Sequence, residues 1–194
     1  MKSSPSFGSL IRLPRLGWFS ALVFFLGAFA CAAQNLAVNP GFESSTDGWF
    51  GWGAVTFTSS SALPHTGASS ALVQNRTATW NGVAQSVLGV VQPATNYSIS
   101  AWVRLVSGSS ETVLLTIKKT DGGGTTYQNV ASGTANSTGW TQLTGSYALT
   151  VNGTLSGLNL YMEGPAAGVS FYADDFIVQE IGRASCRERV LVQV

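Results

Sequence analysis

The stretch Asn96-Tyr97-Ser98-Ile99-Ser100-Ala101-Trp102-Val103-Arg104 decides the fold class, because its side chains alternate in character along the chain. Successive side chains of a β-strand point to opposite faces. One face of this stretch would carry Tyr97, Ile99, Ala101 and Val103, and the other Ser98, Ser100, Trp102 and Arg104. The stretch therefore predicts a β-strand that covers a core with its apolar face.

Similar alternating or β-branched runs recur on both sides of this stretch, separated by Gly, Ser, Thr, Asn and Pro. With the first stretch included, they occupy residues 54–59, 70–74, 82–88, 96–106, 112–118, 142–148, 157–162 and 169–178. No amphipathic helical pattern of twelve residues lies among them. The glycine-rich segment 119–124 indicates a turn between strands rather than a phosphate-binding loop, because no helix follows it. The chain is therefore predicted to be an all-β sandwich.

The N-terminal residues have the composition of a secretory signal peptide. Lys2, Arg12 and Arg15 precede an apolar stretch, residues 16–30, which small residues follow. This run of about 15 residues is shorter than the ~20 that a membrane-spanning helix needs. We expect residues 1–33 to be removed, the protein to be secreted, and no membrane attachment to remain. Attachment of a lipid at Cys31 is the alternative.

The segment 180–194 differs sharply from the preceding sequence, which has few basic residues. The codons GAG ATC GGA AGA GC would encode the beginning of Glu180-Ile181-Gly182-Arg183-Ala184 and match a common short-read sequencing adapter. We therefore expect residues 180–194 to be adapter read-through and the native gene to continue past residue 179. A basic C-terminal extension is the alternative.

Residues 34–179 are expected to form one domain. The domain carries four basic and seven acidic residues, a net charge of −3, although the whole chain has a net charge of +1. It has no basic patch, so nucleic acid is not an expected partner. Cys31 and Cys186 both lie outside the domain, so we expect no disulfide within it.

Three separate pieces of the domain supply aromatic rings and a carboxylate. They are the run 76–82 around Trp80, the isolated Tyr127, and the run 161–164 with Tyr161 and Glu163. Pyranose rings stack on aromatic faces, and their hydroxyls need a few oriented donors and acceptors. The three pieces therefore indicate a sugar-binding groove.

Six motifs occur in a particular order along the domain. They are Asn35-Leu36-Ala37-Val38-Asn39-Pro40-Gly41-Phe42-Glu43 with Gly48-Trp49, His65-Thr66-Gly67-Ala68-Ser69-Ser70-Ala71-Leu72, residues 76–82, Asn96-Tyr97 to Trp102-Val103, Gly139-Trp140-Thr141-Gln142-Leu143, and Phe171-Tyr172-Ala173-Asp174-Asp175-Phe176. Together they resemble carbohydrate-binding modules of the family 4, 9 and 22 group, and family 22 most closely. The resemblance implies a jelly-roll β-sandwich of the galactose-binding-domain-like type. Such modules usually accompany a xylanase or another glycoside hydrolase and bind xylan or mixed-linkage β-glucan.

The resemblance also implies the groove residues. Trp80 and Tyr127 would flank the sugar chain, and Tyr161 and Glu163 would add a ring and a carboxylate acceptor. Trp52 occupies the position where the family groove has an arginine, so an apolar aromatic ring replaces a charged hydrogen-bond donor. Losing one charge-assisted hydrogen bond would cost about 1.5–3 kcal/mol.

Each groove residue also has a structural alternative. Tyr127 and Tyr161 could be half-buried strand tyrosines, and Glu163 could cap a loop. The turn context of Trp80 favours an exposed ring that contacts ligand. Three further tryptophans are expected to pack in the core or on the sheets: Trp49, Trp102 and Trp140.

Acidic residues at the two ends of the domain suggest a metal site. In the family that the chain resembles, these ends meet around a structural calcium ion. We expect Glu43 and Asp175 to bind it, with Asp174 as a further candidate, and backbone carbonyl oxygens to complete its 6–8 ligands. The alternative is that the two aspartates are solvated or accept hydrogen bonds from neighbouring backbone groups.

The sequence predicts a domain without catalytic residues. Glycosidases need two carboxylates across the sugar bond, whereas Glu163 is the only acid in the predicted groove. His65, the only histidine, lacks a nucleophile-elbow motif. Two functions remain open: a binding module that tethers an exported enzyme to β-1,4-linked plant polysaccharide, with the catalytic domain in the same native chain, and a structural or adhesive module.

Overall fold

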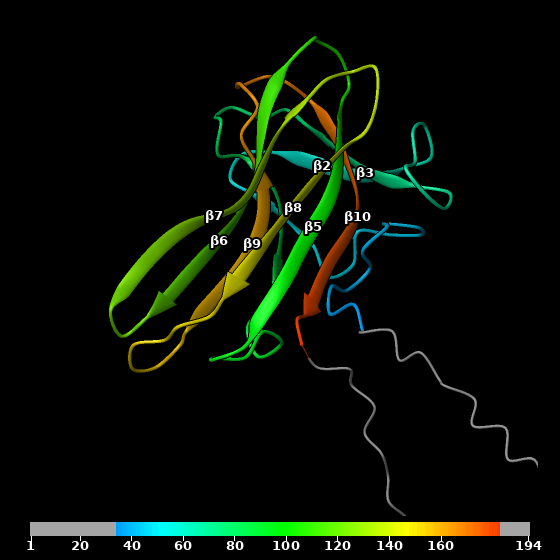
Figure 1. Ribbon diagram of the computed structural model, residues 1–194. Helices are drawn as coiled ribbons and strands as arrows, with labels where there is room; N and C mark the ends of the chain where they lie inside the picture. Colours follow the sequence, from blue (N-terminus) through cyan, green and yellow to red (C-terminus); the bar gives the residue numbers. More distant parts are fainter. Residues whose placement is uncertain (1–33, 183–194) are drawn as a thin grey trace, which may run out of the picture. The chain divides into compact units, whose positions relative to one another are not determined.

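The computed structural model of the protein describes residues 34–182 (Figure 1). The predicted signal peptide, residues 1–33, and residues 183–194 of the predicted read-through segment lie outside the described residues. The described residues form ten strands: β1 (Phe50–Trp52), β2 (Thr56–Ser60), β3 (Ser70–Gln74), β4 (Gly82–Ser86), β5 (Asn96–Leu105), β6 (Glu111–Asp121), β7 (Gly124–Ala135), β8 (Thr141–Ala148), β9 (Gly157–Glu163) and β10 (Phe171–Glu180).

The strands form two five-stranded antiparallel sheets. Sheet A has the strand order β1-β4-β9-β6-β7, and sheet B has the order β2-β3-β10-β5-β8. Figure 1 shows β7, β6 and β9 side by side in one layer, with β8, β5 and β10 in the other. The prediction of an all-β jelly-roll sandwich is confirmed.

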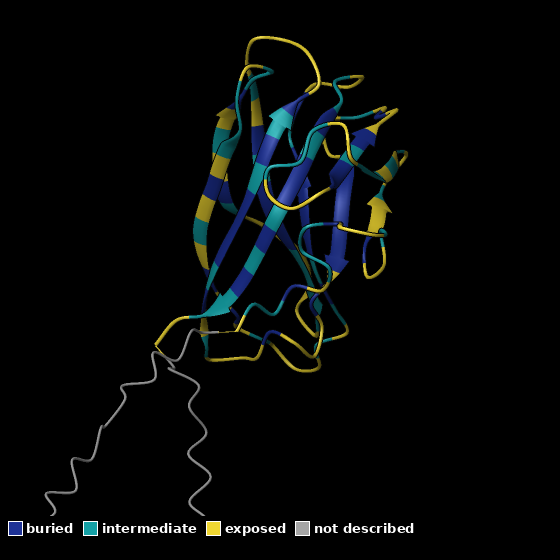
Figure 2. Ribbon diagram, turned by 90° about the vertical axis from the view of Figure 1, so that its right-hand side faces the viewer, coloured by how far each residue is buried: buried dark blue, intermediate teal, exposed yellow. Residues whose placement is uncertain are grey.

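The hydrophobic core lies between the two sheets. In β5, the alternation of the sequence matches the burial: Tyr97, Ile99, Ala101 and Val103 are almost completely buried. Leu158, Leu160 and Met162 of β9 meet this core from sheet A. Figure 2 shows buried residues along the strands and exposed residues mainly in the loops. The outer face of β5 carries Trp102 and Arg104, which are half-buried.

Two strands are absent from the sequence prediction, β1 and β7. The first has only three residues. The second is twelve residues long, but its first six residues are exposed because it lies at the edge of sheet A. This first half has neither face in the core and need not alternate in polarity, whereas Ala131 and Ala135 of the second half reach the core, so the pattern search missed β7. The predicted turn is also shorter than expected, because residues 119–121 still belong to β6.

The two ends of the described region are held together. The Leu36 amide donates a 2.7 Å hydrogen bond to the Val178 carbonyl, and the Asn35 side chain bonds both Phe176 and Val178. Trp49 packs against Phe176 with 4.4 Å between ring centroids, which confirms its predicted place in the core. None of residues 34–182 forms a helix long and apolar enough to cross a membrane.

Candidate functional site

Because successive side chains of β9 point to opposite faces of sheet A, two predicted site residues lie on its outer face. Leu160 and Met162 belong to the core, so the intervening Tyr161 and the following Glu163 face away from it. Tyr161 lies opposite Ala84 of β4 and Thr116 of β6. This face of the sheet is therefore available for a site.

A groove of about 700 Å³ opens on this face. Its lining consists of Phe50, Gly51, Trp52, Gly53, Trp80, Tyr127, Tyr161 and Glu163. All five residues that the sequence predicted for sugar contact are among them. They come from β1, the loop before β4, β7 and β9, and the order of strands in sheet A brings these segments together.

The aromatic side chains of the groove differ in accessibility. Trp80 is 53% exposed and Tyr127 is 61% exposed, so both offer ring surface to a ligand. Tyr161 is only 3% exposed because Trp52 stacks on it, with ring centroids 4.7 Å apart and an interplanar angle of 25°. Tyr161 therefore lies beneath Trp52 and offers little ring surface of its own, close to the alternative of a strand tyrosine that the sequence left open.

Glu163 is the last residue of β9 and is almost buried in the groove. The Thr116 hydroxyl donates a 2.6 Å hydrogen bond to its Oε1 atom. Thr116 Oγ1 also lies 2.9 Å from Asn129 Oδ1. Burial, followed by the charge of Glu163 and a hydrogen bond to it, raises the pKa of Tyr161. Glu163 is therefore a positioned acceptor on the sheet and not the loop cap of the structural alternative.

The loop that carries Trp80 is anchored by Arg76, which is 2% exposed. Its guanidinium donates hydrogen bonds of 2.7–3.4 Å to six backbone carbonyls, those of Ala78, Thr79, Asn81, Pro165, Ala166 and Val169. These carbonyls belong to the segment before β4 and to the segment between β9 and β10. Arg76 therefore joins two loops and holds Trp80 at the end of the groove.

Gly53 allows the Trp80 loop to close against β1. A Cβ atom at this position would overlap the Asn81 amide and the Trp80 ring, and the backbone has a φ of +76°. Asn81 Oδ1 accepts hydrogen bonds from the Thr77 and Ala78 amides, which fixes the turn. Glycine is thus required here for space as well as for backbone conformation.

The sequence analysis missed two residues at the groove, Phe50 and Lys118. Phe50 lies two positions before Trp52, so the period of a strand could have placed both on one face. The Lys118 ammonium lies 5.1 Å from the Trp52 ring centroid and 6.0 Å from that of Tyr127. Counting outward from the turn at Gly122-Gly123 pairs Lys118 with Tyr127, which is the observed register. The position of the turn could therefore have predicted that Lys118 lies beside Tyr127 at the groove.

The predicted metal ligands converge at the edge of the sandwich. A Cβ atom built on Gly41 would lie 3.2 Å from Glu43 Oε1, 3.6 Å from Asp174 Oδ1 and 3.8 Å from Asp175 Oδ1. Asp174 is fully buried, and this burial raises its pKa to about 6. Three carboxylates that meet in this way, one of them desolvated, produce an electrostatic environment that a cation would stabilise.

The same carboxylates also accept hydrogen bonds. Asp174 Oδ2 accepts from the His65 amide at 2.8 Å, and Glu43 Oε2 accepts from the Ala68 amide at 2.7 Å. His65 Nδ1 lies 2.6 Å from Asp175 Oδ2. Within residues 34–182, no group of three or more His, Cys, Asp or Glu side chains by itself has an arrangement able to hold a metal ion. A calcium ion here would therefore depend on backbone carbonyl oxygens as well.

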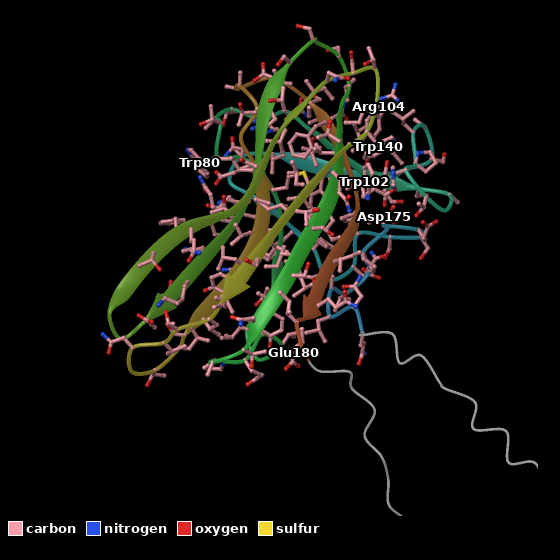
Figure 3. The ribbon with its side chains drawn as sticks, in the orientation of Figure 1. Trp80, Trp102, Arg104, Trp140, Asp175 and Glu180 are labelled. Carbon is pink, nitrogen blue, oxygen red and sulfur yellow. The ribbon has the colours of Figure 1, made fainter. Side chains whose placement is uncertain are left out.

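Two tryptophans expected to pack in the core or on a sheet lie on the side of sheet B, away from Trp80 (Figure 3). His65 stacks on Trp102 with 4.0 Å between centroids and meets the edge of Trp140 at 5.3 Å. Trp102 and Trp140 are half-buried and pack with His65 outside the core. Neither lines the groove on sheet A.

Comparison with known proteins identifies the family. Residues 34–168 match the family model described as a carbohydrate binding domain. The chain is 30% identical to the solved CBM22-1 xylan-binding domain of Paenibacillus barcinonensis Xyn10C, with a TM-score of 0.70 over 78% of this chain and 97% of that one. It is 26% identical to the C-terminal family 22 carbohydrate-binding module of Clostridium thermocellum Xyn10B, with a TM-score of 0.67 over 74% and 91% of the two chains.

A similarity to a much longer protein points the same way. The chain is 32% identical over 136 residues to endo-1,4-beta-xylanase A of Thermotoga maritima, an alignment that covers 69% of this chain and 13% of the xylanase. The chain thus spans a small part of this relative. The family match, the groove and the similarity to a solved domain over almost all of its length lead to one conclusion: the chain belongs to the carbohydrate-binding modules, in family 22.

Proposed function

We propose that the domain binds β-1,4-linked plant polysaccharide in the groove of sheet A, with xylan as the first candidate and mixed-linkage β-glucan as the second. The observation that carries the proposal is the gathering of two exposed rings, Trp80 and Tyr127, with the acceptor Glu163 in one groove. An open groove of this kind favours glycan binding over the structural or adhesive module. The xylan-binding activity named for the similar Paenibacillus domain supports xylan.

The domain acts by binding alone and attaches a catalytic domain of the native protein to its substrate. Glu163 is the single carboxylate in the groove lining found within residues 34–182, and glycoside hydrolysis needs a second one. The similarity to part of a xylanase supports a glycoside hydrolase as the native parent protein. Such a module raises the local concentration of the enzyme at the polysaccharide. The N-terminal sequence supports secretion of the whole protein.

The test is affinity electrophoresis of the protein expressed from residue 34, in gels that contain xylan, mixed-linkage β-glucan or no polysaccharide. We expect xylan to retard the protein. Trp80→Ala should weaken the interaction about tenfold or more, because it removes one of the two exposed stacking surfaces of the groove.

Trp140→Ala is the matched control, since it removes an indole from the side of sheet B and should leave migration unchanged. If only the mixed-linkage β-glucan gel retarded the protein, β-glucan and not xylan would be the ligand. Equal migration of the unmodified protein in all gels would reject glycan binding and favour the structural module.

We also propose a structural calcium ion at Glu43, Asp174 and Asp175. The convergence of their oxygens near Gly41 supports it. Among the described residues, the ion pair found at these carboxylates is that of His65 with Asp175, and neither Lys nor Arg pairs with them. The ion would offset the repulsion of three acidic groups and connect the first loop to β10. Its role would be structural, because the groove residues lie in other segments.

Calcium should raise the thermal stability of the domain. Calcium at 100 times its Kd would stabilise the folded state by about 2.7 kcal/mol, which is about 5–10 °C in Tm for a domain of this size. Differential scanning calorimetry in EDTA and in excess CaCl₂ measures the shift. The double substitution Glu43→Gln and Asp175→Asn should remove the response. An identical Tm in EDTA and in calcium would show that these carboxylates hold no ion.

A further inference from the structure

We propose that Lys118 recognises an acidic substituent on the polysaccharide, the carboxylate of a uronic acid branch. This inference rests on the proposed function, since it assigns a charged contact to the same groove. It would give the domain a preference among β-1,4-linked chains that stacking on aromatic rings alone does not provide.

Lys118 differs from the other cations of the described region in having no acidic partner and no hydrogen bond to the protein. Arg76 bonds six backbone carbonyls, and Arg104 bonds the Ser137 carbonyl with two nitrogens. Lys119 pairs with Asp121 at 2.8 Å and bonds the Thr150 carbonyl. The Lys118 ammonium meets only the faces of Trp52 and Tyr127. Its hydrogen-bonding capacity is therefore available to a ligand.

The sheet register places this ammonium at the groove. Lys118 lies opposite Tyr127 of β7 on one side and Asn159 of β9 on the other. The next positions along these strands on the same face are Thr116 and Tyr161. The ammonium thus lies among the rings on which the sugar chain would stack, so a branch on a bound sugar can reach it. The aromatic faces attract the ammonium and limit where it lies.

The charges of the groove are separated along the sheet. Glu163 lies opposite Leu114 of β6, four residues before Lys118. Four residues of a strand span about 13 Å between Cα atoms. Glu163 Oε1 accepts a hydrogen bond from Thr116, two residues before Lys118, so its carboxylate lies nearer to Lys118 than its backbone does. Lys118 and Glu163 form no ion pair within the described residues. A carboxylate on the ligand could therefore lie near Lys118 without meeting Glu163 directly.

The net charge of the domain makes this cation important for an acidic ligand. Residues 34–179 carry a net charge of −3, so their overall field would repel a uronic acid. A single ammonium at the binding surface can reverse that repulsion locally, because charge-assisted hydrogen bonds to carboxylate are short and strong. A neutral sugar chain does not experience either effect.

Isothermal titration calorimetry with two ligands tests the inference. The ligands are xylohexaose and the same xylohexaose carrying one glucuronic acid branch. At low salt, we expect the unmodified protein to bind the branched ligand about five- to tenfold more tightly. Lys118→Met keeps an unbranched apolar stem but removes the charge, so it should abolish the difference in affinity between the two ligands. Raising the salt concentration should reduce the preference of the unmodified protein.

Lys119→Met is the matched control, because this neighbouring lysine is already paired with Asp121. It should retain the preference for the branched ligand. Equal affinity of the unmodified protein for the two ligands would overturn the inference but leave the proposed function intact. An equal loss of affinity for both ligands in Lys118→Met, with the preference for the branched ligand retained, would also overturn it, because the lysine would then contact the main chain of the sugar. Failure of the unmodified protein to bind either ligand would reject the proposed function as well.

Discussion

Replacing Arg76 with methionine is expected to lower the free energy of unfolding by about 3–5 kcal/mol. The methionine can occupy much of the space of the arginine stem, but it cannot donate hydrogen bonds. Six backbone carbonyls in two loops would lose a partner. Because Arg76 is almost completely buried, water cannot easily replace those bonds. Urea denaturation measures the loss.

The same substitution should weaken glycan binding, because Arg76 holds the carbonyls on both sides of Trp80. Arg104→Met is the matched control: Arg104 is half-buried and bonds only the Ser137 carbonyl. It should cost about 1 kcal/mol and leave binding unchanged. If both arginine variants lost the same amount of stability, the six hydrogen bonds of Arg76 would not account for its contribution to the free energy of unfolding.

Replacing Gly53 with alanine is expected to remove most of the glycan affinity, by about tenfold or more. The new Cβ would overlap Trp80 and Asn81, so the ring at the end of the groove would have to move. Backbone strain at a φ of +76° adds about 1–2 kcal/mol to the stability cost. Retardation in xylan gels measures the affinity, and thermal unfolding measures the stability.

Gly89→Ala separates the two effects of this change. Gly89 has a φ of +79°, similar to that of Gly53, but a Cβ there would meet nothing within 4 Å. The control should therefore show a similar strain cost with normal glycan binding. An equal loss of binding in both variants would mean that the overlap with Trp80 does not determine the shape of the groove.

The groove could be predicted from the sequence where residue type and local pattern carry the information. Trp80 lies in a turn that leaves its ring exposed, and the resemblance to family 22 implied Tyr127 and Glu163. The environment of Tyr161 could not be predicted in this way. Its stacking partner, Trp52, comes from a short strand two positions away in the sheet order, and no local pattern reveals that proximity.

The sequence by itself determined that the chain forms an all-β sandwich and which face of β5 enters the core, because strand period and burial are local properties. It also determined the groove-forming residue types. Only the tertiary structure decided that Tyr161 lies beneath Trp52, that Arg76 bonds two distant loops, and that the Lys118 ammonium lies between two rings. These features depend on which strands become neighbours. That order is set by the packing of the whole core, and alternation along a single strand does not contain it.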